Sequence, residues 1–122
     1  MTEGLKGQVA IITGASRGIG LAIAQALAAQ DIAVALVGRS EATVQAASET
    51  IQKIGGRAIA LRANVTDQRA VDSLVEETIR RLGPIDLLIN NAGSGAAVGP
   101  IWEVSPENWW QDVATNLLGT FL

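Results

Sequence analysis

Residues 13–20, TGASRGIG, place three glycines, a serine and an arginine between an apolar run and an alanine-rich stretch. Glycine lets a chain turn sharply and lets its backbone approach a ligand closely. We expect Gly14 to allow the turn, Gly18 to admit a pyrophosphate, and Gly20 to permit close helix packing. The amides and the positive dipole end of the following helix favour an anion. The segment therefore predicts a phosphate-binding turn.

Two other interpretations of this segment differ in strength. A P-loop is excluded because no Gly-Lys-Ser or Gly-Lys-Thr follows the glycines. An ordinary glycine turn remains the alternative, since a glycine triplet alone is a weak signal. The position of the triplet, directly after a strand pattern and directly before a helix pattern, favours the phosphate-binding interpretation.

Strand and helix patterns alternate along the chain on both sides of this turn. Strand patterns occupy residues 9–12, 32–37, 57–63 and 85–90. Helical patterns follow each strand, beginning near Ile19, after an N-cap at Ser40, after an N-cap at Thr66 or Asp67, and after an N-cap at Ser105 with Pro106 behind it. We expect the last helix to continue to the end of the chain, with one of Trp109 and Trp110 in the core and the other covered by something outside this chain.

Alternating strands and helices of this length predict a single α/β unit over residues 1–122, a Rossmann-type doubly wound parallel sheet. The expected strand order is 3-2-1-4, ending after the fourth strand and its following helix. Ligands of such sheets bind where the winding reverses, here between the first and fourth strands. Two glycine-rich loops, residues 14–20 and 93–99, are expected to meet at that edge.

Composition excludes several classes of function. The 122 residues carry a net charge of −3 and contain neither cysteine nor histidine. Disulfides, thiolate nucleophiles, Cys/His metal sites and histidine bases are therefore absent. No basic stripe indicates nucleic acid, and no apolar run reaches the roughly 20 residues that a membrane span needs. We expect a cytoplasmic protein that binds neither membrane nor nucleic acid.

Four motifs in the right order and at the right distances identify a family. They are TGASRGIG at residues 13–20, ANVTD at 63–67, NNAG at 90–93 and NLLGTF at 116–121. Together they resemble the N-terminal half of the short-chain dehydrogenase/reductase superfamily. The NVTD segment also resembles that of 3-oxoacyl-acyl-carrier-protein reductases. The resemblance implies an oxidoreductase that transfers hydride between nicotinamide and a carbonyl or alcohol substrate.

The resemblance also implies which residues contact the dinucleotide: Gly14, Ser16, Arg17, Gly18, Ile19, Gly20, Arg39, Asn64, Val65, Asn90, Ala92 and Gly93. Within this set, Asn64 and Val65 match the pair that contacts adenine in relatives, and the Asn64 carbonyl can accept from the adenine amino group. Asn91 matches a residue that mostly braces the central sheet. Asn116 matches the asparagine of the family's catalytic helix, which holds a local helix distortion. A solvent-facing asparagine is the alternative for Asn116.

Charge at the end of the second strand indicates which dinucleotide binds. NAD sites of this kind carry an acid there for the ribose 2′-hydroxyl, whereas a 2′-phosphate requires cations. This chain has Arg39 there and Arg17 in the first loop. An arginine fork can bind phosphate through two parallel hydrogen bonds. We therefore expect NADP(H) in preference to NAD(H); a solvated surface charge is the alternative role for Arg39.

The family's proton donor is a tyrosine in a Tyr-x-x-x-Lys segment, helped by a serine. The chain contains no tyrosine, and its only lysines are Lys6 and Lys53. Three interpretations stay open: the dinucleotide-binding portion of a longer enzyme, a half-domain that binds without catalysis, and a self-associating truncated product. In each, the exposed edge of the fourth strand and the apolar last helix predict a homo-oligomer or association with a C-terminal half.

Overall fold

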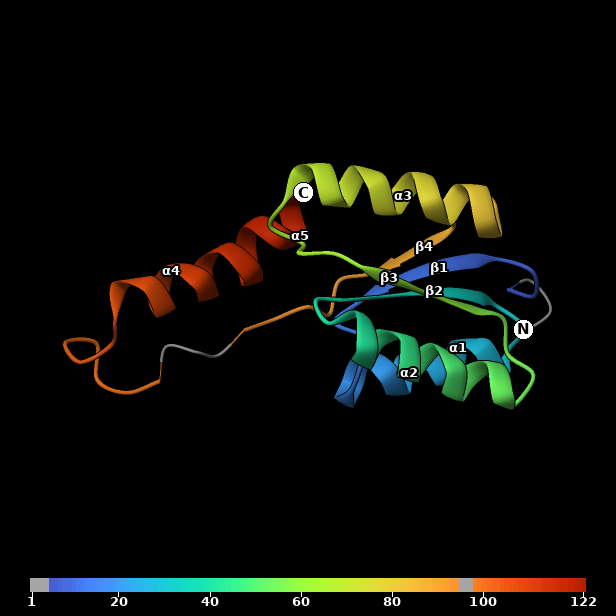
Figure 1. Cartoon of the computed structure of the whole chain (residues 1–122), viewed down its shortest axis with the longest axis horizontal. Helices are drawn as coiled ribbons and strands as arrows, with labels where there is room; N and C mark the ends of the chain where they lie inside the picture. The colour runs from blue at the N-terminus through green and yellow to red at the C-terminus, as the bar shows by residue number, and fades with distance from the viewer. Residues whose placement is uncertain (1–4, 95–97) are drawn as a thin grey trace.

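The computed structural model describes residues 5–94 and 98–122. Residues 1–4 lie outside the described part, as do residues 95–97 within the second expected glycine-rich loop. The strands form one parallel sheet in the order β3-β2-β1-β4, as predicted. They are β1 (Val9–Thr13), β2 (Ala33–Gly38), β3 (Ala58–Arg62) and β4 (Leu87–Ile89). Figure 1 shows α1 (Gly18–Ala29) and α2 (Glu41–Lys53) on one face of the sheet and α3 (Gln68–Leu82) on the other.

Burial on both faces explains why β1 and β2 are apolar throughout. Every residue of these two strands is buried. Because side chains alternate along a strand, Ala10 and Ile12 join the core cluster beneath α1 and α2, whereas Val9 and Ile11 join the cluster beneath α3. A continuous apolar run is the pattern expected of a parallel strand with helices on both sides.

Small residues bring α1 close to the sheet. Its buried positions are Gly20, Ala24 and Ala28, spaced four apart on one face. The neighbouring helix α2 buries larger residues, Val44 and Ile51 among them, and begins at its predicted N-cap. There the Ser40 hydroxyl accepts a hydrogen bond from the Thr43 amide at 3.5 Å.

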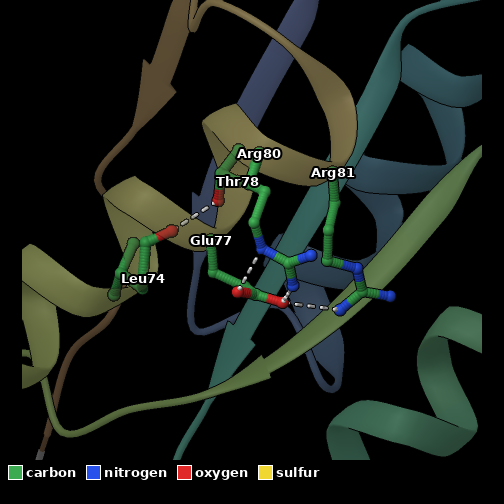
Figure 2. A network of polar contacts seen from close by, with 5 residues as sticks. All are labelled: Leu74, Glu77, Thr78, Arg80 and Arg81. Atoms are coloured by element: carbon green, nitrogen blue, oxygen red, sulfur yellow. Dashed lines mark hydrogen bonds and ion pairs between the residues drawn. The ribbon is translucent and has the colours of Figure 1, made fainter.

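On the opposite face, α3 is capped by Asp67, one of the two predicted candidates. The Asp67 carboxylate accepts hydrogen bonds from the Arg69 and Ala70 amides at 3.0 and 3.3 Å. At the other end of α3, Glu77 pairs with Arg80 and Arg81. Figure 2 shows these pairs beside the buried Thr78 hydroxyl, which donates to the Leu74 carbonyl at 2.7 Å. Partly exposed pairs of this kind stabilise a protein by less than about 1 kcal/mol.

The C-terminal segment differs from the expected uninterrupted helix. It consists of α4 (Pro106–Val113), one π-helical turn, η1 (Ala114–Leu118), and the short α5 (Gly119–Phe121). Figure 1 shows α4 projecting beyond the sheet. Ser105 caps α4 as predicted, since its hydroxyl accepts from the Asn108 amide at 3.1 Å. Among the described residues, no helix is long and apolar enough to cross a membrane.

Two expectations about apolar residues need correction. Trp109 and Trp110 are 51% and 61% exposed, so the expectation that one of them lies in the core is wrong. Both lie on α4, which projects beyond the sheet instead of packing on it. The fourth strand is shorter than the predicted 85–90 and half-exposed, because it lies at the edge of the sheet. Before it, Asp86 pairs with Val9, its amide donating to the Val9 carbonyl and its carboxylate accepting from the Val9 amide, both at 2.9 Å.

Candidate functional site

The turn between β1 and α1 is joined to the end of β4 by hydrogen bonds. The Thr13 hydroxyl accepts from the Asn91 and Ala92 amides at 3.0 and 2.9 Å. The Asn91 side-chain amide donates to the Gly14 carbonyl at 3.1 Å. This agrees with the expectation that Asn91 braces the centre of the sheet. The two strand ends at which the winding reverses are therefore tied into one corner.

The three glycines of the turn meet three different requirements. Gly14 has a φ of +61°, and a Cβ on it would lie 2.9 Å from the Ala92 Cα. Gly18 has a φ of +60°, and no atom lies within 4 Å of the point where its Cβ would stand, so its backbone faces open space. A Cβ on Gly20 would overlap the Gly14 carbonyl oxygen. Left-handed backbone and lack of space thus explain glycine at these positions.

The N-terminus of α1 differs from those of the other long helices. Ser40, Asp67 and Ser105 cap α2, α3 and α4 with side-chain oxygens. The N-cap of α1 is Arg17, whose side chain makes no capping hydrogen bond. A guanidinium cannot accept a hydrogen bond, so it leaves the first-turn amides to another acceptor. Together with the helix dipole, these amides and Arg17 favour an anionic group.

The ends of β2 and β3 form a second wall. The Ala63 amide donates to the Gly38 carbonyl at 3.0 Å. Arg39 follows directly, and its exposed side chain extends towards α4. With the Gln111 amide oxygen turned towards the guanidinium, both Arg39 Nη atoms lie 3.3 Å from that oxygen. Arg39 is therefore at the margin between the strand ends and α4.

The side-chain oxygen of Asn64, which follows β3, is already bonded within its own turn. Asn64 Oδ1 accepts from the Thr66 amide at 3.0 Å and from the Thr66 hydroxyl at 2.6 Å. Using that oxygen to bind adenine would require breaking these bonds within the turn. The adjacent Val65 is buried and packs against Gly119, where a Cβ would lie 2.6 Å from Val65 Cγ2.

Asn116 lies in the π turn and forms two hydrogen bonds with the loop after β4. Its Oδ1 accepts from the Ser94 amide at 2.8 Å, and its Nδ2 donates to the Ser94 carbonyl at 3.0 Å. The expected local helix distortion is present at this residue, because η1 spans Ala114–Leu118. π turns of this kind are frequent at functional sites.

These walls enclose a cavity of about 800 Å³, within the range of small-molecule sites. The sequence-predicted residues that line it are Gly14, Ser16, Arg17, Gly18, Ile19, Arg39, Val65, Ala92 and Gly93. Those that do not line it are Gly20, Asn64, Asn90 and Asn116. Two of these residues contact lining residues instead: Gly20 packs against Gly14, and Asn116 is hydrogen-bonded to Ser94. Asn90 borders a smaller, apolar hollow of about 160 Å³ beside Leu88 and α5.

The cavity is also lined by residues that were not predicted to contact the ligand: Val37, Gly38, Ser40, Thr43, Ala63, Asn91, Ser94 and Thr115. Most of these adjoin a predicted strand end, so the rule that parallel strands present their carboxyl ends at one edge could have found them. Thr43 and Thr115 lie within helical segments, and no motif pointed to them.

The charge of the cavity is opposite to that of the protein. Among its described lining residues, Arg17 and Arg39 are cationic and none is acidic, although the whole chain has a net charge of −3. The cavity also contains backbone amides at a helix N-terminus and apolar surface from Ile19 and Val65. This combination suits a ligand that carries both phosphate groups and an apolar part.

Comparisons with known proteins agree with this geometry. The family model for short chain dehydrogenases matches residues 8–122. A 3-oxoacyl-acyl-carrier-protein reductase from Synechocystis sp. is 40% identical over 119 residues, which cover 97% of this chain and 48% of that protein.

Solved structures of similar reductases share this fold. A 3-ketoacyl-ACP reductase from Sinorhizobium meliloti has a TM-score of 0.88 and 40% identity, covering 93% of this chain and 44% of that one. A metagenomic short-chain oxidoreductase in complex with NADP has a TM-score of 0.88 and 35% identity, covering 96% of this chain and 53% of that one. The chain therefore spans about half the length of the relatives it matches.

Proposed function

Because the chain belongs to the short-chain dehydrogenase family, we propose that its cavity binds a nicotinamide dinucleotide and prefers NADP(H) to NAD(H). The observation that carries this proposal is the β1–α1 corner. There the Gly18 backbone opens onto the cavity, and the N-cap Arg17 offers a cation but no capping acceptor. The pyrophosphate would bind to the first-turn amides, and Gly14 and Gly20 would hold the turn in shape.

The preference for NADP(H) follows from the charge beside β2. Arg39 lies at the end of β2, where an acid would bind the ribose 2′-hydroxyl of NAD. A guanidinium can instead bind a 2′-phosphate by charge-assisted hydrogen bonds. Its present partner Gln111 is neutral, so moving Arg39 onto a phosphate breaks no ion pair with that residue. The relative solved in complex with NADP supports this assignment.

We propose that residues 1–122 form the dinucleotide-binding half of an oxidoreductase domain whose substrate is a carbonyl or alcohol compound. A dinucleotide held by this corner would supply the hydride-transfer chemistry. The chain contains no tyrosine, so the proton donor of the resembling enzymes would come from outside these residues. This chain would bind and orient the dinucleotide, and Asn116 would hold the loop beside it through Ser94.

A second candidate is a unit that binds the dinucleotide without catalysis. Exposed apolar side chains on and near α4 and α5 support the proposal that either form associates with another surface, through a second copy or a C-terminal half. These side chains are Ile101, Trp102, Trp109, Trp110, Leu117, Leu118 and Phe121. Oxidation of NADPH that depends on an added carbonyl compound would separate an enzyme from a binding unit.

Calorimetric titration of the chain with NADPH and NADH tests the proposal. We expect saturable binding of NADPH and weaker binding of NADH. Arg39→Glu should weaken NADPH binding roughly 10- to 100-fold, because a charged hydrogen bond contributes about 1.5–3 kcal/mol, and should change NADH binding little. Arg57→Glu is the matched control, since Arg57 is exposed and precedes β3, at the amino-terminal end of the strand and away from the carboxyl ends that form the cavity. Equal losses of both ligands in Arg39→Glu would contradict the 2′-phosphate role.

A further inference from the structure

Two side chains of the C-terminal segment, Asp112 and Asn116, together hold Ser94 beside the cavity, and of these three residues only Asn116 belongs to a family motif. Ser94 lines the cavity on the loop after β4. Its hydroxyl donates to Asp112 Oδ1 at 2.6 Å, its amide donates to Asn116 Oδ1 at 2.8 Å, and its carbonyl accepts from Asn116 Nδ2 at 3.0 Å. Each hydrogen-bonding group of Ser94 is thus held by the segment that comprises α4 and η1.

Asp112 binds the Ser94 hydroxyl, which Asn116 does not contact. The Asn116 amide holds the Ser94 peptide, whereas Asp112 holds the side chain and lies one turn earlier. A hydroxyl–carboxylate hydrogen bond is charge-assisted and about twice as strong as a neutral one. Asp112 is half-buried, so water competes for this bond less than at an exposed site. The pair therefore ties α4 itself, and not only the π turn, to the wall of the cavity.

The sheet order shows which part of a bound dinucleotide would meet this wall. β2, with Arg39 after it, lies on one side of β1, and β4, with Ser94 after it, lies on the other. Strands are about 4.8 Å apart, so the ends of β2 and β4 are separated by roughly 10 Å. A dinucleotide with its 2′-phosphate on Arg39 and its pyrophosphate on the turn after β1 must extend its nicotinamide half towards Ser94.

We propose that Asp112 is a positioning residue which, by holding Ser94, shapes the cavity wall that receives the nicotinamide half of the dinucleotide. This inference rests on the proposed dinucleotide-binding function. It predicts that losing Asp112 weakens the binding of a ligand that reaches β4, and leaves unchanged the binding of a ligand that ends at the pyrophosphate position.

Two ligands separate these effects: NADPH, and adenosine 2′,5′-bisphosphate, which has the 2′-phosphate but no nicotinamide. Titrated calorimetrically against the 122-residue chain, Asp112→Ala should bind NADPH about tenfold more weakly and the bisphosphate as the unsubstituted chain does. Asp112→Asn keeps a neutral oxygen acceptor and should recover part of the NADPH affinity. Ser94→Ala should match Asp112→Ala, and the double variant should lose no more than either single one.

Asp72→Ala is the matched control, because it removes an exposed acid from α3 and changes the net charge equally. Thermal melts establish that each variant is folded, and Ser94→Ala carries the test if Asp112→Ala does not fold. Equal weakening of both ligands in a folded variant would mean that Asp112 supports only the fold, and no change in either would also overturn the proposal. If the unsubstituted chain binds neither ligand, the proposed function itself fails.

Discussion

Replacing Gly18 with alanine separates the role of this glycine in the fold from its role in binding. Gly18 is the first residue of α1, with a φ of +60° and open space where a methyl would stand. An alanine in left-handed backbone costs about 1–2 kcal/mol. Because nothing within 4 Å would collide with the methyl, we expect no further loss of stability.

Gly55 provides a control with the same backbone cost. It lies in the loop between α2 and β3, has a φ of +86°, and also has no atom within 4 Å of a methyl. It does not line the cavity. Gly55→Ala should therefore reduce the free energy of unfolding by about the same 1–2 kcal/mol, measured by urea denaturation.

Binding of NADPH distinguishes the two variants. In Gly18→Ala the added methyl stands where the backbone would meet the pyrophosphate, so calorimetry should show binding at least about tenfold weaker, equivalent to about 1.4 kcal/mol. Gly55→Ala should bind NADPH as the unsubstituted chain does. If both variants are equally stable and bind NADPH with equal affinity, the backbone at Gly18 does not contact the ligand.

Two further predictions concern the stability of the corner and of a helix. Gly20→Ala should lower the free energy of unfolding by more than about 3 kcal/mol, measured by urea denaturation. The reason is that the new Cβ would overlap the Gly14 carbonyl oxygen and lie 2.5 Å from Asn91 Nδ2. A loss below about 1 kcal/mol would show that the helix shifts easily. Asp67→Ala should cost about 1 kcal/mol by removing the N-cap of α3. It should leave NADPH affinity unchanged, since Asp67 does not line the cavity, and a tenfold loss of affinity would contradict the proposed site.

The strands and three helix caps could be predicted because they depend on local patterns, and the sheet order could be predicted from the topology of doubly wound sheets. Apolar runs with glycine-rich ends identify the strands, and Ser40 and Ser105 precede helical patterns. For the third cap the sequence leaves two candidates, since Thr66 and Asp67 are both suitable residues. Asp67 caps the helix, whereas Thr66 donates its hydroxyl to Asn64.

Contacts between distant segments could not be predicted in this way. The bond between Ser94 and Asp112 and the approach of Gln111 to Arg39 depend on where α4 lies relative to the strand ends. Similarly, nothing in the composition of α4 shows that it projects beyond the sheet with both adjacent tryptophans exposed. The family motif indicates a distortion near Asn116, but the extent of the π turn follows only from the packed structure.

The proposed site depends on backbone amides at the start of α1 which, with Arg17 and Arg39, bind the phosphates of a dinucleotide. An NMR titration of the ¹⁵N-labelled chain with NADPH tests it most directly. We expect saturable shifts concentrated in the amides of residues 16–20 and in the Arg39 guanidinium. Saturable shifts that leave these groups unmoved, or no shifts at millimolar NADPH, would contradict it.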